Sequence, residues 1–369
     1  GYSNLVYQSI IGSSNLTFKT GAGFRWDDYR ESVSFFKGEA NSGKWNRTEI
    51  VPGVFGELTW TPRPWLSHVV GLRYDYHNLF GNWLTPRLHT RIDFNENSVL
   101  RLSAGVGRRI ANIFAENSAL FASSRRWYMP NKIENGGLYG SANPDFSSTE
   151  GGLKPEQAMN FGVGWNHAFR LNNRKGSFNV DLYHTRFIQQ TVVDLDQNSQ
   201  SAFFYNLAGK SNSTAFQVQL EYEPIRRLDV RLAWKGQDVQ QTINGQLLER
   251  PFVASQRFFV NLAYETKSKW SFDATLNWTG SKRLPSTRMN PENLQLASRS
   301  PDFFMLNGQI SKAWKNLELY AGIENAFDFR QKQLIVNPGQ PNKPYFDASM
   351  VWGPVIGSMF YSGLRCTIR

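Results

Sequence analysis

The pattern of the whole chain is clearest in Trp270-Ser271-Phe272-Asp273-Ala274-Thr275-Leu276-Asn277-Trp278, where apolar and polar side chains alternate without a break. Successive side chains of a β-strand point to opposite faces. One face of this segment therefore carries only apolar side chains, and the other carries serine, aspartate, threonine and asparagine. The segment predicts a strand that lies between an apolar medium and water.

The same alternation recurs along the chain, for example in 178–183, 216–222 and 100–106. It predicts about 14 strands. They lie near residues 15–33, 47–62, 67–79, 83–94, 99–109, 155–170, 176–196, 202–226, 228–243, 254–266, 269–282, 302–313, 316–328 and 357–369.

The links between these strands alternate in length. Short turns are predicted at 95–97, 171–175, 226–227, 267–268 and 315, and longer links at 34–46, 110–154, 244–253, 283–301 and 329–356. Residues 79–83 and 197–201 are shorter links on the same side as the long ones. Membrane barrels of bacteria have short turns at one rim and long loops at the other. A β-solenoid or propeller would instead show a fixed internal period, and we find none.

Composition supports a membrane barrel over a set of soluble domains. Hydrophobic residues make up 40% of the 369-residue chain, yet aromatic residues reach 14%. A membrane barrel would give this combination, because aromatic residues gather at both membrane interfaces and one face of each strand is polar. No run of about 18 apolar residues exists, which leaves a closed barrel as the way to cross a bilayer. The first residues contain no signal peptide, so we expect further residues upstream.

Four short motifs lie at predicted strand ends. They are Pro86-Arg87-Leu88 before a strand, Gly107-Arg108-Arg109 at a strand end, Leu153-Lys154-Pro155-Glu156 at a strand start, and Asn325-Ala326-Phe327-Asp328 closing the penultimate strand. In this order they resemble the barrel region of TonB-dependent outer-membrane receptors over nearly the whole chain. Ala326 departs from the family's leucine, and Ile368-Arg369 replaces its terminal aromatic residue.

The resemblance implies an all-β fold: a transmembrane, antiparallel, up-and-down β-barrel in a Gram-negative outer membrane, with the C-terminus in the periplasm. The resemblance implies a complete barrel of about 22 strands with a plugged lumen. We expect residues 1–369 to form a single, partial barrel domain holding about 14 of these strands. The N-terminal plug domain and the first strands would then lie outside this chain.

The resemblance also implies a function: active uptake of a scarce ligand such as a siderophore, cobalamin or another metal chelate. Expected partners are the TonB complex, reached through the missing N-terminal region, outer-membrane lipid and lipopolysaccharide, the barrel-assembly machinery, and a small-molecule, metal-chelate, sugar or peptide ligand. Nucleic acid is not expected. Two alternatives stay open: a passive porin of about 14 strands, and a surface protein that binds a partner without transport.

Candidate ligand-binding residues lie in the predicted long links and at the strand ends beside them, because long loops on a rigid frame often carry function. They are Arg108, Arg109, Arg125, Arg126, Trp127, Tyr128, Lys282, Arg283, Tyr345, Phe346 and Trp352. The chain has 41 Lys and Arg against 30 Asp and Glu, which favours acidic ligands. Alternatively, the cations bind lipopolysaccharide phosphates or pair with carboxylates of the lumen, and the loops merely fold over the barrel mouth.

We expect no cofactor, no metal site and no catalytic residues. The five histidines, His68, His77, His89, His167 and His184, are scattered. His77 and His89 would share the lumen face of neighbouring strands, but a turn near Gly81 would place His89 opposite about Arg73. No motif of a nucleophile with its base, of a phosphate-binding loop or of a zinc helix is present.

Overall fold

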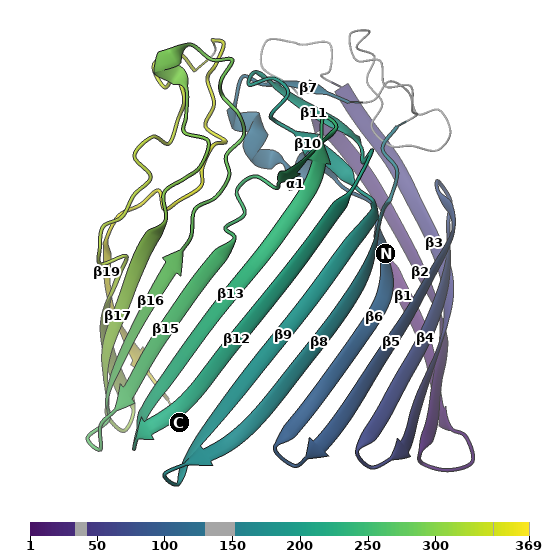
Figure 1. Ribbon diagram of the computed structural model, residues 1–369, viewed down its shortest axis with the longest axis vertical. Coiled ribbons are helices and arrows are strands. Elements are labelled where there is room, and N and C mark those ends of the chain that lie inside the picture. The colour runs from purple at the N-terminus through teal and green to yellow at the C-terminus, as the bar shows by residue number, and fades with distance from the viewer. Residues whose placement is uncertain (34–42, 130–151, 342, 369) are drawn as a thin grey trace.

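The computed structural model describes residues 1–33, 43–129, 152–341 and 343–368, and nearly all of these lie in or above one curved antiparallel sheet (Figure 1). The sheet has 16 strands among the described residues, in the order β1-β2-β3-β4-β5-β6-β8-β9-β12-β13-β15-β16-β17-β18-β19, with β14 paired to β13. The order follows the chain, so this is an up-and-down sheet. We call it the wall; β1 and β19 are its two edges.

The strands of the wall have these bounds: β1 Tyr2–Ile10, β2 Leu16–Val33, β3 Gly43–Arg63, β4 Leu66–His77, β5 Gly81–Asn95, β6 Ser98–Arg109, β8 Glu156–Leu171, β9 Arg174–Gln189, β12 Ser211–Ile225, β13 Leu228–Ile243, β14 Gln246–Glu249, β15 Gln256–Glu265, β16 Trp270–Thr279, β17 Phe303–Ala313, β18 Leu317–Glu324 and β19 Met359–Cys366. All 14 predicted strands are present, and β1 and β14 are additional.

The register keeps the predicted alternation across neighbouring strands. Leu276 lies opposite Val260 and Leu306, whereas Thr275 lies opposite Asn261 and Asn307. Directly paired residues of antiparallel strands share a face, so the wall has one apolar face and one polar face. The apolar face leaves large side chains exposed, as expected of a surface that meets lipid.

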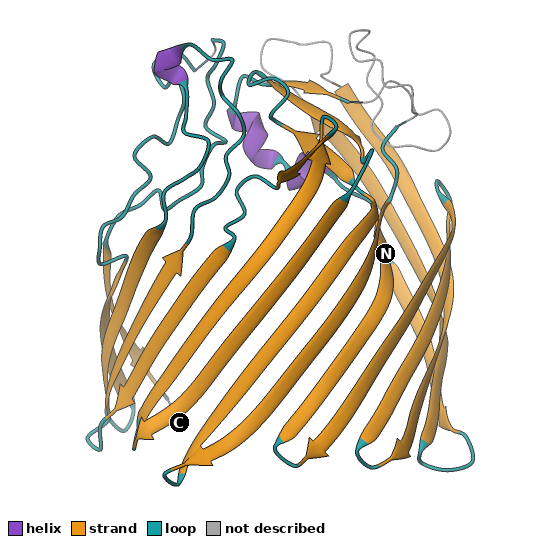
Figure 2. Cartoon of the chain, in the orientation of Figure 1, coloured by secondary structure: helices purple, strands orange, loops and turns teal. Residues whose placement is uncertain are grey.

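Short and long connections separate to opposite ends of the wall, as predicted (Figure 2). The short-turn rim carries two-residue turns such as Asn172-Asn173, both in the left-handed region. The long-loop rim carries the segments 110–155, 190–210, 244–255, 280–302 and 325–358. We call the described parts of these five segments, apart from β14, the canopy. β19 ends at the short-turn rim.

The canopy has secondary structure of its own. A second sheet has the order β10-β11-β7, with β10 Thr191–Asp194, β11 Ser201–Asn206 and β7 Arg126–Tyr128. The short helices are α1 Ile113–Glu116, η2 Ser118–Ala122 and η3 Glu292–Leu294. Asn112 caps α1 by accepting a hydrogen bond from the Ala115 N–H. No described helix has the length and apolar character that spanning a membrane requires.

Three details of the predicted strands were wrong. The predicted strands 176–196 and 202–226 each divide into a wall strand and a canopy strand. Pro86 lies inside β5, where the pairing to β6 ends, because proline has no N–H to donate. The turn after β4 is tighter than expected and pairs His77 with Gly81, so His89 lies opposite Val69 instead of Arg73.

Candidate functional site

The canopy contains a hydrophobic core built from two links of the chain, 110–155 and 190–210. Trp127 is at its centre, stacked on Phe204 at 4.9 Å and on Phe121 at 4.8 Å between ring centroids. The cluster of buried residues is Ile113, Phe114, Leu120, Trp127, Met129, Leu153, Leu195, Ala202 and Phe204. Burial of each large apolar side chain contributes roughly 1.5–3 kcal/mol to the free energy of folding. This core therefore holds segments 110–155 and 190–210 together.

A buried ion pair joins two links far apart in sequence. The Nε of Arg125 donates to Oδ2 of Asp347 at 2.7 Å, and both side chains are nearly fully buried. Arg125 also donates to the Ser201 carbonyl at 3.1 Å. Backbone bonds run alongside: the Phe346 carbonyl accepts from the Ser124 N–H at 2.8 Å. Arg125, a predicted ligand residue, therefore ties segments 110–129, 190–210 and 325–358 together.

A second ion pair joins the links on the other side of the canopy. Arg283 contacts Asp196 through two parallel hydrogen bonds of 2.9 Å each, a geometry that fixes the direction of both side chains. The Asp196 carboxylate also accepts from the Ser286 N–H at 2.8 Å. The predicted cation Arg283 is thus engaged within the canopy, with its side chain only 16% exposed.

Lys282 belongs to an aromatic group at the base of the same links. Its Nζ donates to the Trp352 carbonyl and lies 5.8 Å from the ring centroid of Phe303. Phe303 stacks on Phe329 at 4.6 Å, and Trp352 flanks both rings. Burial and the nearby Arg257 lower the pKa of the Lys282 ammonium. Trp352 itself remains half-buried, with part of its surface open.

The two arginines at the end of β6 point to opposite faces. Arg108 lies on the apolar face and donates to the Asn82 carbonyl at 3.4 Å. Arg109 lies on the polar face, where it contacts Glu156 at 2.6 Å and Glu116 at 2.9 Å. These three charged groups line a cavity of about 180 Å³ between wall and canopy. The adjacent residues Arg108 and Arg109 therefore lie in two different environments.

The remaining predicted residues lie at the canopy surface or close to it. Arg126 is exposed, and Tyr128, stacked on Phe203 at 4.9 Å, is half-buried. Tyr345 and Phe346 are also half-buried, and Tyr345 has a φ of 69°. The predicted link 110–154 continues through 130–151, which lies outside the described residues.

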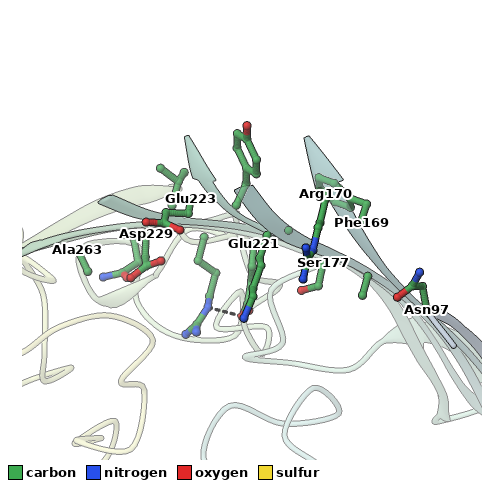
Figure 3. Close-up of a pocket in the computed structure, with 15 residues that line it drawn as sticks. Asn97, Phe169, Arg170, Ser177, Glu221, Glu223, Asp229 and Ala263 are labelled. Atoms are coloured by element: carbon green, nitrogen blue, oxygen red, sulfur yellow. Dashed lines mark hydrogen bonds and ion pairs between the residues drawn. The ribbon is translucent and has the colours of Figure 1, made fainter. Parts of the chain in front are cut away.

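A larger cavity, of about 900 Å³, lies on the polar face near the short-turn rim (Figure 3). Glu221 and Arg231 meet there at 2.7 Å, drawn as a dashed line in the figure. Glu223, Asp229 and Arg170 add further charge. Strands β8, β9, β12, β13 and β15 supply most of the lining, so the wall alone forms this surface.

Sequence reasoning missed the acidic partners Asp196 and Asp347 and the exposed Arg250, which lines the cavity beside Arg109. One signal was present for Asp347: it is the one acidic residue between 329 and 358, a link with Arg330, Lys332 and Lys343. Within the described ranges, no three His, Cys, Asp or Glu side chains converge as a metal site requires.

Comparison with known proteins gives a family and a fold. The family model described as "TonB dependent receptor-like, beta-barrel" matches residues 2–326. No curated protein matches the sequence.

Solved structures similar to this chain include a receptor and a transporter by title. A mutant of the ferric enterobactin receptor of Pseudomonas aeruginosa has a TM-score of 0.69 at 14% identity, covering 99% of this chain and 53% of that one. The FrpB iron transporter of Neisseria meningitidis has 0.63 at 13%, covering 98% and 54%. The FpvAI–pyocin S2 complex has 0.63 at 12%, covering 99% and 48%. This chain thus spans about half the length of the structures it matches.

Proposed function

The chain belongs to the family of TonB-dependent receptor-like β-barrels, an outer-membrane family of receptors and transporters, and from this premise we propose that it is the translocation barrel of a siderophore or other metal-chelate receptor. In this proposal, the canopy faces outward and binds the chelate. The wall then forms the passage, and its apolar face meets lipid. The supporting observation is the folded canopy itself, fixed by its own core above one rim of the wall.

The canopy's surface suits a ligand that is bound before transport. A passive porin needs an open mouth, and a loop domain with a buried core would obstruct it. Tyr128, Tyr345, Phe346 and Trp352 are half-buried, and Arg126 is exposed. Aromatic surface with a few polar or charged groups is what ligand sites commonly present. The ion pairs of Arg125 and Arg283 would then hold this surface in place instead of contacting ligand.

The energy for transport would come from elsewhere. We propose that a plug and a TonB-contacting region belong to the same polypeptide outside residues 1–369, in line with the half-length match to the solved receptors. The short-turn rim and the C-terminus would then lie in the periplasm, and the polar face would contact the plug. Lipopolysaccharide would contact the apolar face near the canopy, where Arg108 lies. Insertion would use the barrel-assembly machinery.

Uptake in cells tests the proposal. Cells that produce the full-length protein, with TonB intact or deleted, are given a panel of radiolabelled ferric chelates. We expect saturable uptake of at least one chelate, lost when TonB is deleted. The matched control is a variant with an intact canopy and a deleted N-terminal TonB-contacting region, which should bind but not import. Uptake that survives loss of TonB, or steady ion conductance of the purified protein in a planar bilayer, would favour a porin.

A further inference from the structure

The cavity beside Arg109 is a built crevice between the wall and the canopy. Its volume is about 180 Å³, below the roughly 300–1,000 Å³ of pockets that hold a drug-sized ligand. The wall supplies Arg109, Glu156 and Phe187 to its lining. The canopy supplies Glu116 from α1, Thr191 from β10 and Arg250 from the link after β14. The crevice can hold one small chemical group of a ligand, but it is too small for a whole metal chelate.

The charged groups of the crevice balance one another. Arg109 is shared between Glu116 and Glu156. The other oxygen of Glu156 accepts from the Thr191 N–H at 3.1 Å. Arg250 adds a second cation, so the lining holds two arginines and two glutamates. An ionised ligand group would therefore meet no net opposite charge in this crevice.

Two polar groups of the crevice lack partners in the described structure. The Thr191 hydroxyl is buried and makes no hydrogen bond, in a residue only 8% exposed. The guanidinium of Arg250 makes none with the described residues either, although its residue is exposed. Thr191 and Val193 share one face of β10 and both line the crevice, whereas Val192 is fully buried on the other face. Buried polar atoms without a partner are rare, so the Thr191 hydroxyl points to a water molecule or ligand group bound in the crevice, whereas the exposed Arg250 can bind solvent.

We propose that this crevice binds an uncharged, hydroxyl-rich group about the size of one sugar ring, carried by the transported ligand. Thr191 and Arg250 donate to its oxygens, a carboxylate oxygen of Glu116 accepts from its hydroxyls, and its ring packs against Phe187. Both donors and acceptors are present, and the sum of charges is zero, which suits hydroxyl groups better than a carboxylate or phosphate. The inference rests on the proposed function, because it names an arm of the ligand that the canopy receives.

The test measures binding of methyl β-glucoside to the purified full-length protein in detergent, by ligand-observed NMR. Thr191→Val should weaken binding by up to about tenfold, the effect of one lost hydrogen bond. Thr191→Ser should keep it. Since the Thr191 hydroxyl has no partner in the unliganded protein, Thr191→Val should leave the unfolding temperature of the canopy unchanged. A purely structural role for this residue would give the reverse pattern.

Arg250→Ala should weaken glucoside binding, whereas Arg288→Ala, an exposed arginine of another link, should not. Acetate and inorganic phosphate serve as charged probes and should not displace the glucoside. Tighter binding of either anion, no glucoside binding at all, or unchanged binding in Thr191→Val would overturn the inference. The measurement needs neither TonB nor transport, so its result is independent of the uptake experiment.

Discussion

The wall and the canopy are stabilised by different physics. Strand pairing is continuous across the wall from β1 to β19, and most large side chains on its apolar face are exposed to the surroundings. The canopy has few backbone ladders, but it holds most of the buried apolar residues of the described chain. Hydrogen bonds and lipid stabilise the wall, while side-chain packing and buried ion pairs stabilise the canopy. The same chain thus carries a membrane frame and a small globular core.

This difference gives each region its own response to mutation. A wall strand tolerates change on its polar face, since water and other polar groups surround it, but not a charge on its apolar face. The canopy resembles the interior of a soluble domain, where a lost partner leaves a buried group unsatisfied. Three substitutions separate these responses, taken from the largest expected effect to the smallest.

Arg125→Ala should have the largest effect and should act on the canopy alone. It leaves the carboxylate of Asp347 buried without its cation, a change that costs about 3–5 kcal/mol in comparable sites. Hydrogen exchange should then become much faster in residues 113–129 and 343–350 and stay slow in the wall strands.

The double variant Arg125→Ala with Asp347→Ala is the control for that result, because it removes the stranded charge. It should recover part of the lost protection. Equal exchange in the canopy of the single variant and of the wild-type protein would contradict a structural role for the pair.

Leu262→Arg should destabilise the wall and spare the canopy. Leu262 is exposed on the apolar face in the second half of β15, opposite Val230 and Ala274, and an arginine on a lipid-facing position costs up to about 2–4 kcal/mol, depending on its depth in the bilayer. Its neighbour Ala263 lies opposite Asp229 and Asp273 on the polar face. Urea unfolding in lipid vesicles should show the loss for Leu262→Arg only, and an equal loss for Ala263→Arg would refute the assignment of the faces.

Tyr205→Phe should have the smallest effect at neutral pH, about 1 kcal/mol. The Tyr205 hydroxyl donates to Asp194 at 3.1 Å and accepts from the Asn244 N–H at 3.0 Å. Burial, with the charge of Asp194, raises the pKa of Tyr205 although the Asn244 bond opposes the shift. A raised pKa in the folded state means that stability is lost as the pH rises above about 10, where the unfolded side chain ionises.

Near-ultraviolet circular dichroism of the canopy checks this pH dependence. The signal of the wild-type protein should fall above pH about 10. Tyr205→Phe should lack that alkaline transition. A transition of the same size in both proteins would mean that another group controls it.

The wall could be predicted from the sequence because its period of two residues is local. Strand β13 has the predicted bounds, and most others differ by a few residues. β1 was missed because Leu5, Val6 and Tyr7 are consecutive apolar residues and hide the alternation. Residues 190–194, Gln-Thr-Val-Val-Asp, contain no glycine or proline to mark where the chain leaves the wall, so β9 and β10 were merged.

The canopy could not be predicted, because its contacts are not local. Arg125 and Asp347 are separated by 222 residues, and no spacing in the sequence brings them together. Trp127 was expected to contact ligand, but it is buried between Phe121 of its own segment and Phe204 of segment 190–210. These aromatic and charged residues lie in the canopy or at the strand ends beside it, and their division between core and surface depends on the fold.

The central claim is that wall and canopy belong to a longer, plugged receptor. The most direct test is the intact mass of the native protein extracted from outer membranes. The account predicts about 80–100 kDa, roughly what a plug and the further strands of a 22-strand barrel require. A mass near the 42.2 kDa of this chain would contradict it and would indicate a self-contained barrel.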